Sequence, residues 1–486
     1  MVRHLKHSYA GDKKSSLRNS LKSPFFTAVA EMKAKQLLPN LDDETIAKML
    51  SVIGLKSIDD LFLDIPRDLK LTRELNIPSG MSEMEIERHM QELLARNYVK
   101  PTLNFLGAGA YYHYVPAVVE QIIGRSEFYT AYTPYQPEIS QGMLQSLFEY
   151  QSLICNLTQM DAANSSMYDW GTAAGEAARM AFRLNGRKRI LVSANVGPER
   201  FEIMKTYIWP LDMQVEKIPY DKRTGRSDLN AIRNRMTDDV SAMYIENPNF
   251  FGVFEDDSEE IASVAHEKKA LLITGIDPIS LGITKPPGEY GADIAVGEGQ
   301  AMGMHVNFGG PYAGIFAVRG GQEIIRQIPG RMIGMTTTKD GSRRGFSQVL
   351  QTREQHIRRE NATSNICTNQ SLCALTACVY LALLGEEGAK NLSRRIIATS
   401  HYASKVLSEV SGADVPYFEG SFFRELAIKI KGKKISKKLL QNGIIGGLDL
   451  SRSFSELKDV YLYSFSELHS PADIQKLAEA LKKAIS

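Results

Sequence analysis

Short apolar runs alternate with helix-length segments from about Ser140 onward, and this alternation constrains the fold more than any other feature. Most gaps between the runs hold a mixed polar and apolar pattern of helical length, such as Ser258 to Lys268. Strands separated by helices of roughly 10 to 15 residues predict a largely parallel sheet covered on both faces. The predicted strands are Arg189 to Ser193, Gln214 to Pro219, Ser241 to Ile245, Ala270 to Thr274, Ala292 to Val296 and Gly314 to Val318.

The pattern changes after about Asn369, where a long apolar helix is predicted over Leu372 to Leu384. Two further strands, Phe423 to Ile430 and Val460 to Phe465, and a final helix from Pro471 complete the chain. At 486 residues the chain exceeds the length at which a single core stops growing. We expect an N-terminal helical region over residues 41–104, a large α/β domain over 105–368 and a small α+β C-terminal domain over 369–486.

The N-terminal region carries helix-start signals and is preceded by a basic segment. Residues 1–40 are rich in lysine with interspersed serines, a composition that resembles a transit peptide. The interpretation we prefer is a poorly ordered basic extension or an upstream start site. Capping residues then predict three helices, at Asp42 or Asp43, at Ser57 with Asp60, and at Ser82 with Glu85.

Overall composition indicates a soluble globular protein. A net charge of +2 argues against nucleic-acid binding, which requires a strong basic excess. No apolar run approaches the roughly 20 residues needed to cross a bilayer. The four cysteines have neither metal-ligand spacing nor the density of a secreted scaffold, so we expect free thiols and a cytoplasmic location.

Tyrosines gather in two loop segments ahead of a predicted helix, FLGAGAYYHYVP at Phe105 to Pro116 and FYTAYTPYQPEIS from Phe128. A buried phenol requires a hydrogen-bond partner, so a core has little use for so many hydroxyls. The spacing alone leaves open a tyrosine-rich surface loop or a functional site. The residues concerned are Tyr111, Tyr112, Tyr129, Tyr132 and Tyr135, with His113, Gln136 and Glu138.

Several motifs resemble those of a known family. TAYTPYQPEISQG, IENPNFFG, GADIAVGEGQ with FGGPYAG, and LQTREQHIRRENATSNICTNQ span most of the chain after Leu41. They resemble the glycine dehydrogenase (decarboxylating) family, the P-protein of the glycine cleavage system. The match is to its N-terminal half, which in some organisms is a separate chain, subunit 1. The resemblance implies fold type I of the pyridoxal phosphate enzymes.

That fold requires three groups from the chain: backbone amides for the cofactor's phosphate, a carboxylate for its pyridine nitrogen and a lysine for its aldehyde. Thr172 opens an Ala-rich helix whose amides are candidates for a phosphate site, although a tight helix start explains the pattern equally well. The resemblance places Asp277 at the position of the carboxylate that pairs with the pyridine nitrogen. A role in capping the turn before Pro278 is about equally plausible. The resemblance places Gln300 at the position of the cofactor-binding lysine, and an amide cannot form an imine. The implied cofactor pocket, with Thr172, Asp277 and Gln300, is therefore expected to be degenerate.

The resemblance then implies a partner chain. A lysine-bearing subunit 2 would bind pyridoxal phosphate covalently, and the pair would form a heterodimer or heterotetramer. The assembly would decarboxylate glycine and transfer the aminomethyl group to lipoylated H-protein. The candidate interface or trans active-site residues are Tyr111, Tyr112, His113, Tyr132, Tyr135, Gln136, Glu138, Arg353 and His356. For Arg353 and His356, a solvated or interdomain helix face is an equally open interpretation.

Two other functions are considered. The chain is alternatively a structural or regulatory pseudo-enzyme that stabilises its partner or docks H-protein. An independent pyridoxal phosphate enzyme would need another lysine, and the nearest one upstream, Lys285, precedes Pro286 and lies before the strand. A nicotinamide site is not indicated, because GAGAYY at Gly107 lacks the third glycine of the dinucleotide fingerprint.

Overall fold

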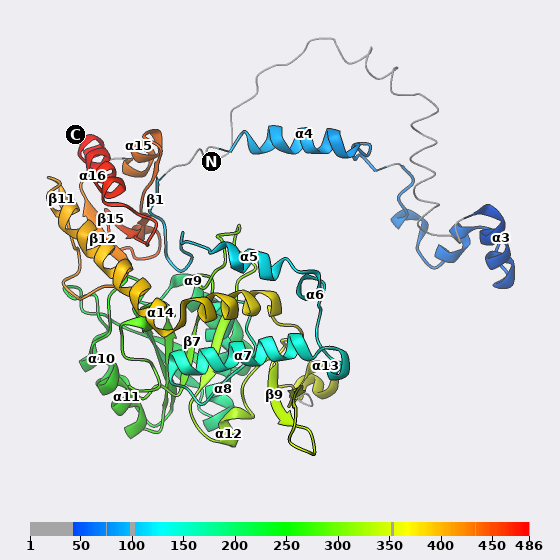
Figure 1. Cartoon of the computed structure of the whole chain (residues 1–486), viewed down its shortest axis with the longest axis horizontal. Coiled ribbons are helices and arrows are strands. Elements are labelled where there is room, and N and C mark those ends of the chain that lie inside the picture. Colours follow the sequence, from blue (N-terminus) through cyan, green and yellow to red (C-terminus); the bar gives the residue numbers. More distant parts are fainter. Residues whose placement is uncertain (1–41, 74, 98–102, 351–353, 433, 486) are drawn as a thin grey trace, which may run out of the picture. The chain divides into compact units, whose positions relative to one another are not determined.

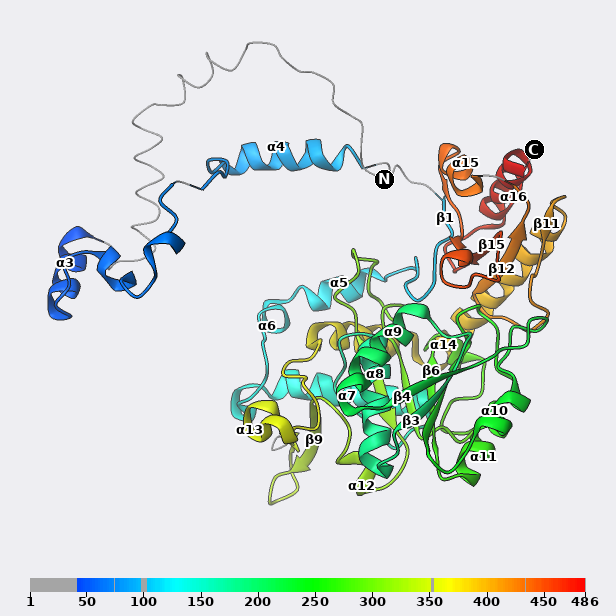
Figure 2. The same ribbon diagram turned by 180° about the vertical axis from the view of Figure 1, so that it is seen from behind.

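The computed structural model describes residues 42–73, 75–97, 103–350, 354–432 and 434–485. The predicted extension over residues 1–40 lies outside these ranges. The chain divides into two compact units, Met1–Tyr98 and Val99–Ser486, which we describe separately. Figure 1 and Figure 2 show the elements of both units.

The first unit contains short helices whose starts match the predicted caps. The Asp42 side chain accepts from the Thr45 N–H at 2.8 Å, and Ser82 with Glu85 forms a reciprocal capping box. Ser57 with Asp60 forms another box, but the element that follows is a short 3₁₀ helix. The helices are α3 (Asp43–Val52), η1 (Ile58–Phe62), η2 (Arg67–Leu69) and α4 (Glu83–Leu94).

A seven-stranded sheet forms the centre of the second unit, in the order β2-β8-β7-β6-β5-β3-β4. Strands β7, β6, β5, β3 and β4 run parallel, whereas β8 is antiparallel to β7 and β2 is antiparallel to β8. The predicted, largely parallel sheet is therefore confirmed. The strands are β2 (Ala162–Ala163), β3 (Arg189–Ser193), β4 (Gln214–Ile218), β5 (Val240–Asn247), β6 (Leu271–Ile276), β7 (Ile294–Glu298) and β8 (Gly314–Val318).

Helices cover both faces of this sheet, because its strands are apolar on both sides. Alternate strand residues such as Leu191 and Met243 face one core, which holds residues of α7, α10, α11 and α14. Their neighbours Val192 and Tyr244 face the second core, built on α8 and α9, which lie side by side in Figure 2. The helices are α7 (Gln141–Thr158), α8 (Trp170–Asn185), α9 (Pro198–Ile208), α10 (Leu229–Arg235), α11 (Ser258–Glu267) and α14 (Ser371–Ser408).

A second, antiparallel sheet occupies the C-terminal part in the order β11-β12-β15-β14. It packs with α15, α16 and the second half of α14 into a separate core. Its elements are β11 (Ala413–Asp414), β12 (Glu425–Ile430), α15 (Ile435–Gln441), β14 (Leu448–Asp449), β15 (Val460–Ser464) and α16 (Pro471–Ile485). The remaining strands are β1 (Leu103–Asn104), which pairs with β13 (Ile444–Ile445), and the hairpin β9 (Met332–Thr337) with β10 (Arg344–Val349).

Helix α14 joins the two parts of the second unit and breaks at Gly385, whose φ is +59°. It extends beyond the predicted Leu384 because the chain resumes a helix after this left-handed residue. Among the described residues it is the one helix long and apolar enough to cross a membrane. Several of its apolar residues, including Tyr380 and Leu381, are buried in the core that also holds residues of α7, so this part of α14 belongs to the protein core.

Short helices complete the described chain: α5 (Ala117–Ile123), α6 (Ser126–Tyr129), η3 (Pro137–Ile139), η4 (Trp209–Leu211), η5 (Ser280–Gly282), α12 (Gln322–Ile325), α13 (Gln355–Arg358), η7 (Arg359–Asn361) and η8 (Leu450–Arg452).

Gly252 supplies a stability test of the junction between β5 and β12. Its φ is +83°, and an added Cβ would lie 2.2 Å from the Glu425 carbonyl oxygen. We expect Gly252→Ala to lower the free energy of unfolding by roughly 2 kcal/mol or more, measured by denaturant titration. Gly142→Ala is the matched control, because no atom lies within 4 Å of the added Cβ in helix α7. It should be neutral or stabilise by about 0.5–1 kcal/mol; equal effects of both changes would refute the packing argument.

Glu176 on α8 supplies a pH test. Neither of its carboxylate oxygens has a hydrogen-bond partner, and Arg179 Nη1 lies 3.7 Å away. Burial raises the pKa of Glu176 from its ordinary value of 4.5 to about 7. Because the folded-state pKa is the higher one, this group's stability contribution is present below pH 4.5 and is lost as pH rises through 7.

Glu176→Gln should therefore match the wild type in unfolding free energy near pH 4. By pH 8 the variant should be more stable by up to roughly 3 kcal/mol, because it has no buried charge to form. Denaturant titrations across this range provide the measurement. A difference between the two proteins that stays constant with pH would show that Glu176 does not titrate in this range.

Candidate functional site

The candidate site lies at the carboxyl ends of the parallel strands β5, β6 and β7, where α/β sheets bind their ligands. The first turns of α8 and α9 and the start of β12 close it from the other sides. The remaining cavity has a volume of about 10 Å³. Residues lining it include Tyr111, Trp170, Arg200, Phe250, Asp277 and Arg424.

Gln300, two residues beyond β7, is fully buried and bonded to backbone groups. Its Oε1 accepts from the Tyr111 N–H at 2.8 Å. Its Nε2 donates to the carbonyls of Tyr111 at 3.1 Å and Met304 at 2.7 Å. Both amide hydrogens and one oxygen lone pair are thus in use, which is the condition for burying an amide without a large desolvation cost.

Asp277 directly follows β6 and is paired with Arg424. Arg424 Nε lies 2.7 Å from Oδ2, Nη2 donates to Oδ1 at 3.0 Å, and both side chains are almost completely buried. Burial raises the pKa of Asp277, while the Arg424 guanidinium acts in the opposite direction. Each oxygen of this carboxylate therefore already faces a cation.

Protein carboxylates also occupy the N-terminus of α8. The Thr172 N–H donates to Asp169 Oδ1 at 2.7 Å, and the Trp170 N–H donates to Glu298 Oε2 at 3.1 Å. Glu298 Oε1 accepts from Ala313 at 3.2 Å. Burial raises the pKa of Glu298 to about 8, whereas these N–H donors favour its charged form. Whether or not Glu298 is protonated, its Oε2 accepts from the Trp170 N–H, a donor at the helix N-terminus that a phosphate would need.

Arg200 and Trp170 fill the space between these groups. The Arg200 guanidinium carbon lies 3.8 Å from the Trp170 ring centroid. Arg200 Nε and Nη2 donate to the two oxygens of Glu246 at 2.6 and 2.7 Å. The Trp170 indole N–H donates to the Tyr244 hydroxyl at 3.1 Å. The result is a closed layer of aromatic and charged side chains.

This arrangement does not fit pyridoxal phosphate. Gln300 supplies no amine, Asp277 is paired with Arg424, and the helix donors are capped by Asp169 and Glu298. A cavity of about 10 Å³ has room for one water at most, far less than a cofactor requires.

The tyrosine loop, residues 107–116, crosses this site. Tyr111 and His113 are buried inside the chain, and Tyr111 donates its O–H to Glu425 Oε2 at 3.0 Å. Tyr112 and Tyr114 are 55% and 58% exposed. The predicted residues of this loop thus divide into two that pack inward and neighbours that face solvent.

A second group of predicted residues lies beside the β9–β10 hairpin. Tyr132, Tyr135, Gln136 and Glu138 are exposed. The Tyr135 hydroxyl accepts from Arg331 Nη2 at 2.7 Å.

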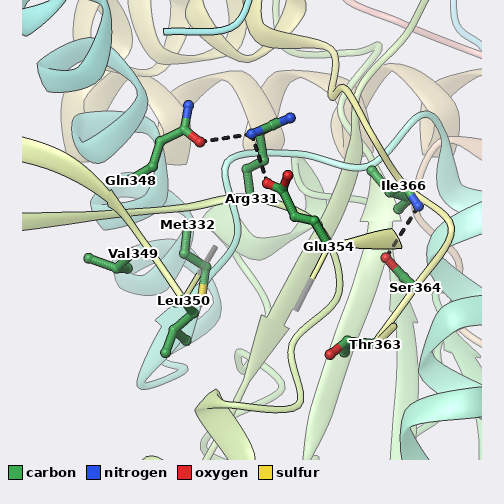
Figure 3. Close-up of a pocket in the computed structure, with 10 residues that line it drawn as sticks. Arg331, Met332, Gln348, Val349, Leu350, Glu354, Thr363, Ser364 and Ile366 are labelled. Carbon is green, nitrogen blue, oxygen red and sulfur yellow. Dashed lines mark hydrogen bonds and ion pairs between the residues drawn. The ribbon is translucent and has the colours of Figure 1, made fainter. Parts of the chain in front are cut away.

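Arg331 connects this group to the 354–367 segment. Its Nη1 donates to Gln348 at 2.8 Å and to Glu354 at 3.0 Å, beside a cavity of about 20 Å³ (Figure 3). His356 is exposed, with Nε2 3.3 Å from Glu354 Oε2, whereas Arg353 lies outside the described residues. The structure therefore brings residues 132–135 next to 354–368, which the sequence alone did not predict.

Sequence reasoning missed most of the residues that fill the site. The missed residues are Trp170, Arg200, Glu246, Glu298, Arg424 and Glu425. Adjacent charges at Arg424 and Glu425 inside a predicted apolar strand were the available signal, because buried charges require partners. Nothing local to the sequence identifies those partners.

Comparison with known proteins agrees with this fold. The family model "Glycine cleavage system P-protein" matches residues 36–481. A probable glycine dehydrogenase (decarboxylating) subunit 1 from Staphylothermus marinus is 47% identical over 461 residues, covering 92% of this chain and 98% of the relative. The corresponding protein of Carboxydothermus hydrogenoformans is 48% identical over 445 residues, covering 91% and 98%.

Solved structures give the same result. A crystal structure of glycine decarboxylase (P-protein) of the glycine cleavage system, in inhibitor-bound form, has a TM-score of 0.83 at 39% identity, covering 91% of this chain and 98% of that one. A sphingosine-1-phosphate lyase of Burkholderia pseudomallei has a TM-score of 0.60 at 14% identity, covering 87% and 94%, and shows the fold alone. The predicted fold type I class is confirmed. Since the family model and relatives nearly half identical cover almost the whole length, the chain belongs to the glycine cleavage system P-protein family and is similar to its subunit 1 members.

Proposed function

We propose that this chain is the lysine-free subunit of a two-chain glycine decarboxylase and completes the reaction site of a lysine-bearing subunit 2. The observation that carries the proposal is the position of Gln300. The family resemblance implies that its amide stands at the position of the cofactor-binding lysine, and backbone groups bind it on both sides. Such a chain has no group of its own with which to hold the cofactor covalently there.

Pyridoxal phosphate in this assembly would be bound by the partner's lysine. The capped helix donors and the Asp277–Arg424 pair support that assignment, because they leave no room for it in this chain. In the proposed reaction glycine loses its carboxylate as CO₂. Its aminomethyl carbon forms a bond to one sulfur of the oxidised lipoyl disulfide of H-protein, while the other sulfur is reduced to a thiol.

The residues offered to the partner are the exposed ones in the two predicted groups. Tyr112 projects from the tyrosine loop, and Tyr132, Tyr135, Gln136 and Glu138 lie beside the segment with His356. Phenol and amide groups provide hydrogen bonds to a carboxylate or a phosphate without adding net charge. Tyr111 and His113 are buried, so we assign them a supporting role inside this chain.

We further propose that the assembly works in a reducing, cytoplasmic setting. Cys155, Cys367, Cys373 and Cys378 are all free. Burial raises the pKa of the Cys373 thiol to about 11 and that of Cys378 to about 12, which makes these two thiols unreactive.

Reconstitution with the lysine-bearing partner tests the function directly. Carbon exchange between glycine and bicarbonate should be absent with either chain alone and present when both are combined. Tyr112→Phe should lower that exchange on the order of 100-fold, the usual cost of removing one positioned hydrogen-bond donor. The complex should still form, as judged by co-elution.

Tyr402→Phe is the matched control. Tyr402 is an exposed tyrosine on α14 whose hydroxyl accepts from Gln475 Nε2 at 3.3 Å, and its change should leave the exchange unaltered. Full activity of Tyr112→Phe in the complex would instead favour the structural or regulatory role.

A gain-of-lysine variant tests where the cofactor binds. Gln300→Lys in the isolated chain should not acquire the visible absorbance of a lysine–cofactor imine when pyridoxal phosphate is added. Arg424 still neutralises Asp277, and Asp169 and Glu298 still cap α8. The isolated partner subunit serves as the positive control. A borohydride-sensitive band in the Gln300→Lys chain would show that the missing amine alone prevents binding.

A further inference from the structure

Gln300 pairs with Tyr111 in the manner of a neighbouring strand. Its Oε1 accepts from the Tyr111 N–H at 2.8 Å while its Nε2 donates to the Tyr111 carbonyl at 3.1 Å. A side-chain amide can do this because it carries a donor and an acceptor in the geometry of a peptide group. The third bond, from Nε2 to the Met304 carbonyl, ties the same amide to its own loop.

His113 makes a second connection between the same two loops. Its Nδ1 lies 3.0 Å from the Tyr111 carbonyl, and its Nε2 lies 3.3 Å from the Gly303 N–H. Both contacts are satisfied by a neutral imidazole protonated on Nδ1, and burial lowers the pKa of His113 in agreement with that form. The ring also meets Tyr380 edge-on, with centroids 6.2 Å apart.

Glu425 and Arg424 hold the outer end of the loop. Glu425 accepts from the Tyr111 hydroxyl at 3.0 Å and from the Ala108 N–H, and the Arg424 guanidinium lies 4.2 Å from the Tyr111 ring centroid. Tyr111 is therefore held by its ring, its hydroxyl and both backbone polar groups.

This anchoring determines the direction of the neighbouring side chains. Along the loop Tyr111 and His113 are buried, whereas Tyr112 and Tyr114 are 55% and 58% exposed. Such alternation is typical of extended chain, in which successive side chains point to opposite sides. Holding Tyr111 and His113 inward leaves Tyr112 between them directed outward.

We infer that Gln300 is a positioning residue that orients Tyr112 toward the partner's reaction site. On this inference the Gln300 amide anchors the tyrosine loop at the position that the resemblance gives to the cofactor-binding lysine. The inference rests on the proposed function. A lysine at position 300 would not serve, because an ammonium group has no acceptor for the Tyr111 N–H. Glutamine in place of lysine at position 300 would thus remove the cofactor-binding amine and supply the loop anchor in one substitution.

A double-mutant cycle in the reconstituted two-chain enzyme tests this inference. Gln300→Met keeps the side-chain length but removes the amide, so it should lower kcat by about 10- to 100-fold through misplacement of Tyr112. KM for glycine should stay within about twofold, because the change affects a group used in the reaction. The variant carrying both Gln300→Met and Tyr112→Phe should be no slower than Tyr112→Phe alone.

Two further variants separate positioning from general damage. His113→Phe removes the second connection and should reproduce the Gln300→Met pattern, which keeps the test valid should Gln300→Met fail to assemble. Asn185→Leu is the matched control, because Asn185 also bonds backbone in both directions, to Ser241 at 2.9 Å and from Arg187 at 3.1 Å. It is the last residue of α8 and bonds at the amino end of β5, opposite to the candidate site, so the change should leave kcat unchanged.

The outcomes distinguish this inference from the proposed function. A fall in kcat for Tyr112→Phe with normal kcat for Gln300→Met, or losses that multiply in the double variant, would overturn the inference and leave the proposed function standing. Full activity of Tyr112→Phe would overturn both.

Discussion

The two-way pairing of the Gln300 amide with the Tyr111 backbone is the interaction on which the rest of the site depends. It joins the end of β7 to the tyrosine loop, which Glu425 also holds from the C-terminal part of the unit. A lysine in this position would have donors alone, and the Tyr111 N–H would be buried without an acceptor. Position 300 therefore anchors the tyrosine loop only when it carries both a donor and an acceptor, as glutamine does.

Two ion pairs between buried side chains also hold the site together. Arg424 pairs with Asp277 and Arg200 pairs with Glu246, all of them largely buried. Buried ion pairs add little net stability, because desolvation offsets most of their attraction. Removing one member, however, leaves an uncompensated charge in a dry site, which is strongly unfavourable. These pairs consequently fix the shape of the candidate site and leave a cavity of only about 10 Å³.

The sequence predicted the fold well because its signals are local. Strand β8 matches its predicted bounds, and Ser82 with Glu85 forms the expected box, since apolar periodicity and capping depend on nearby residues. Helix α14 was predicted too short because a left-handed glycine interrupts it without ending it.

The site could be predicted only in part. Asp277 was located by its position after a strand and Gln300 by the family resemblance, but Arg424 lies 147 residues from Asp277 and Tyr111 lies 314 residues from Glu425. No spacing rule connects residues so far apart, and packing alone decides which buried charges meet. For the same reason the sequence did not distinguish inward-facing His113 from outward-facing Tyr112.

Counting the cofactor in the assembled enzyme tests the central claim most directly. Borohydride reduction of the complete two-chain complex, followed by peptide mapping, reports both the number and the location of covalently held pyridoxal groups. The account predicts one group per pair of unlike chains, with every labelled peptide derived from the lysine-bearing partner. A second group, or a labelled peptide from the chain that carries Gln300, would contradict it.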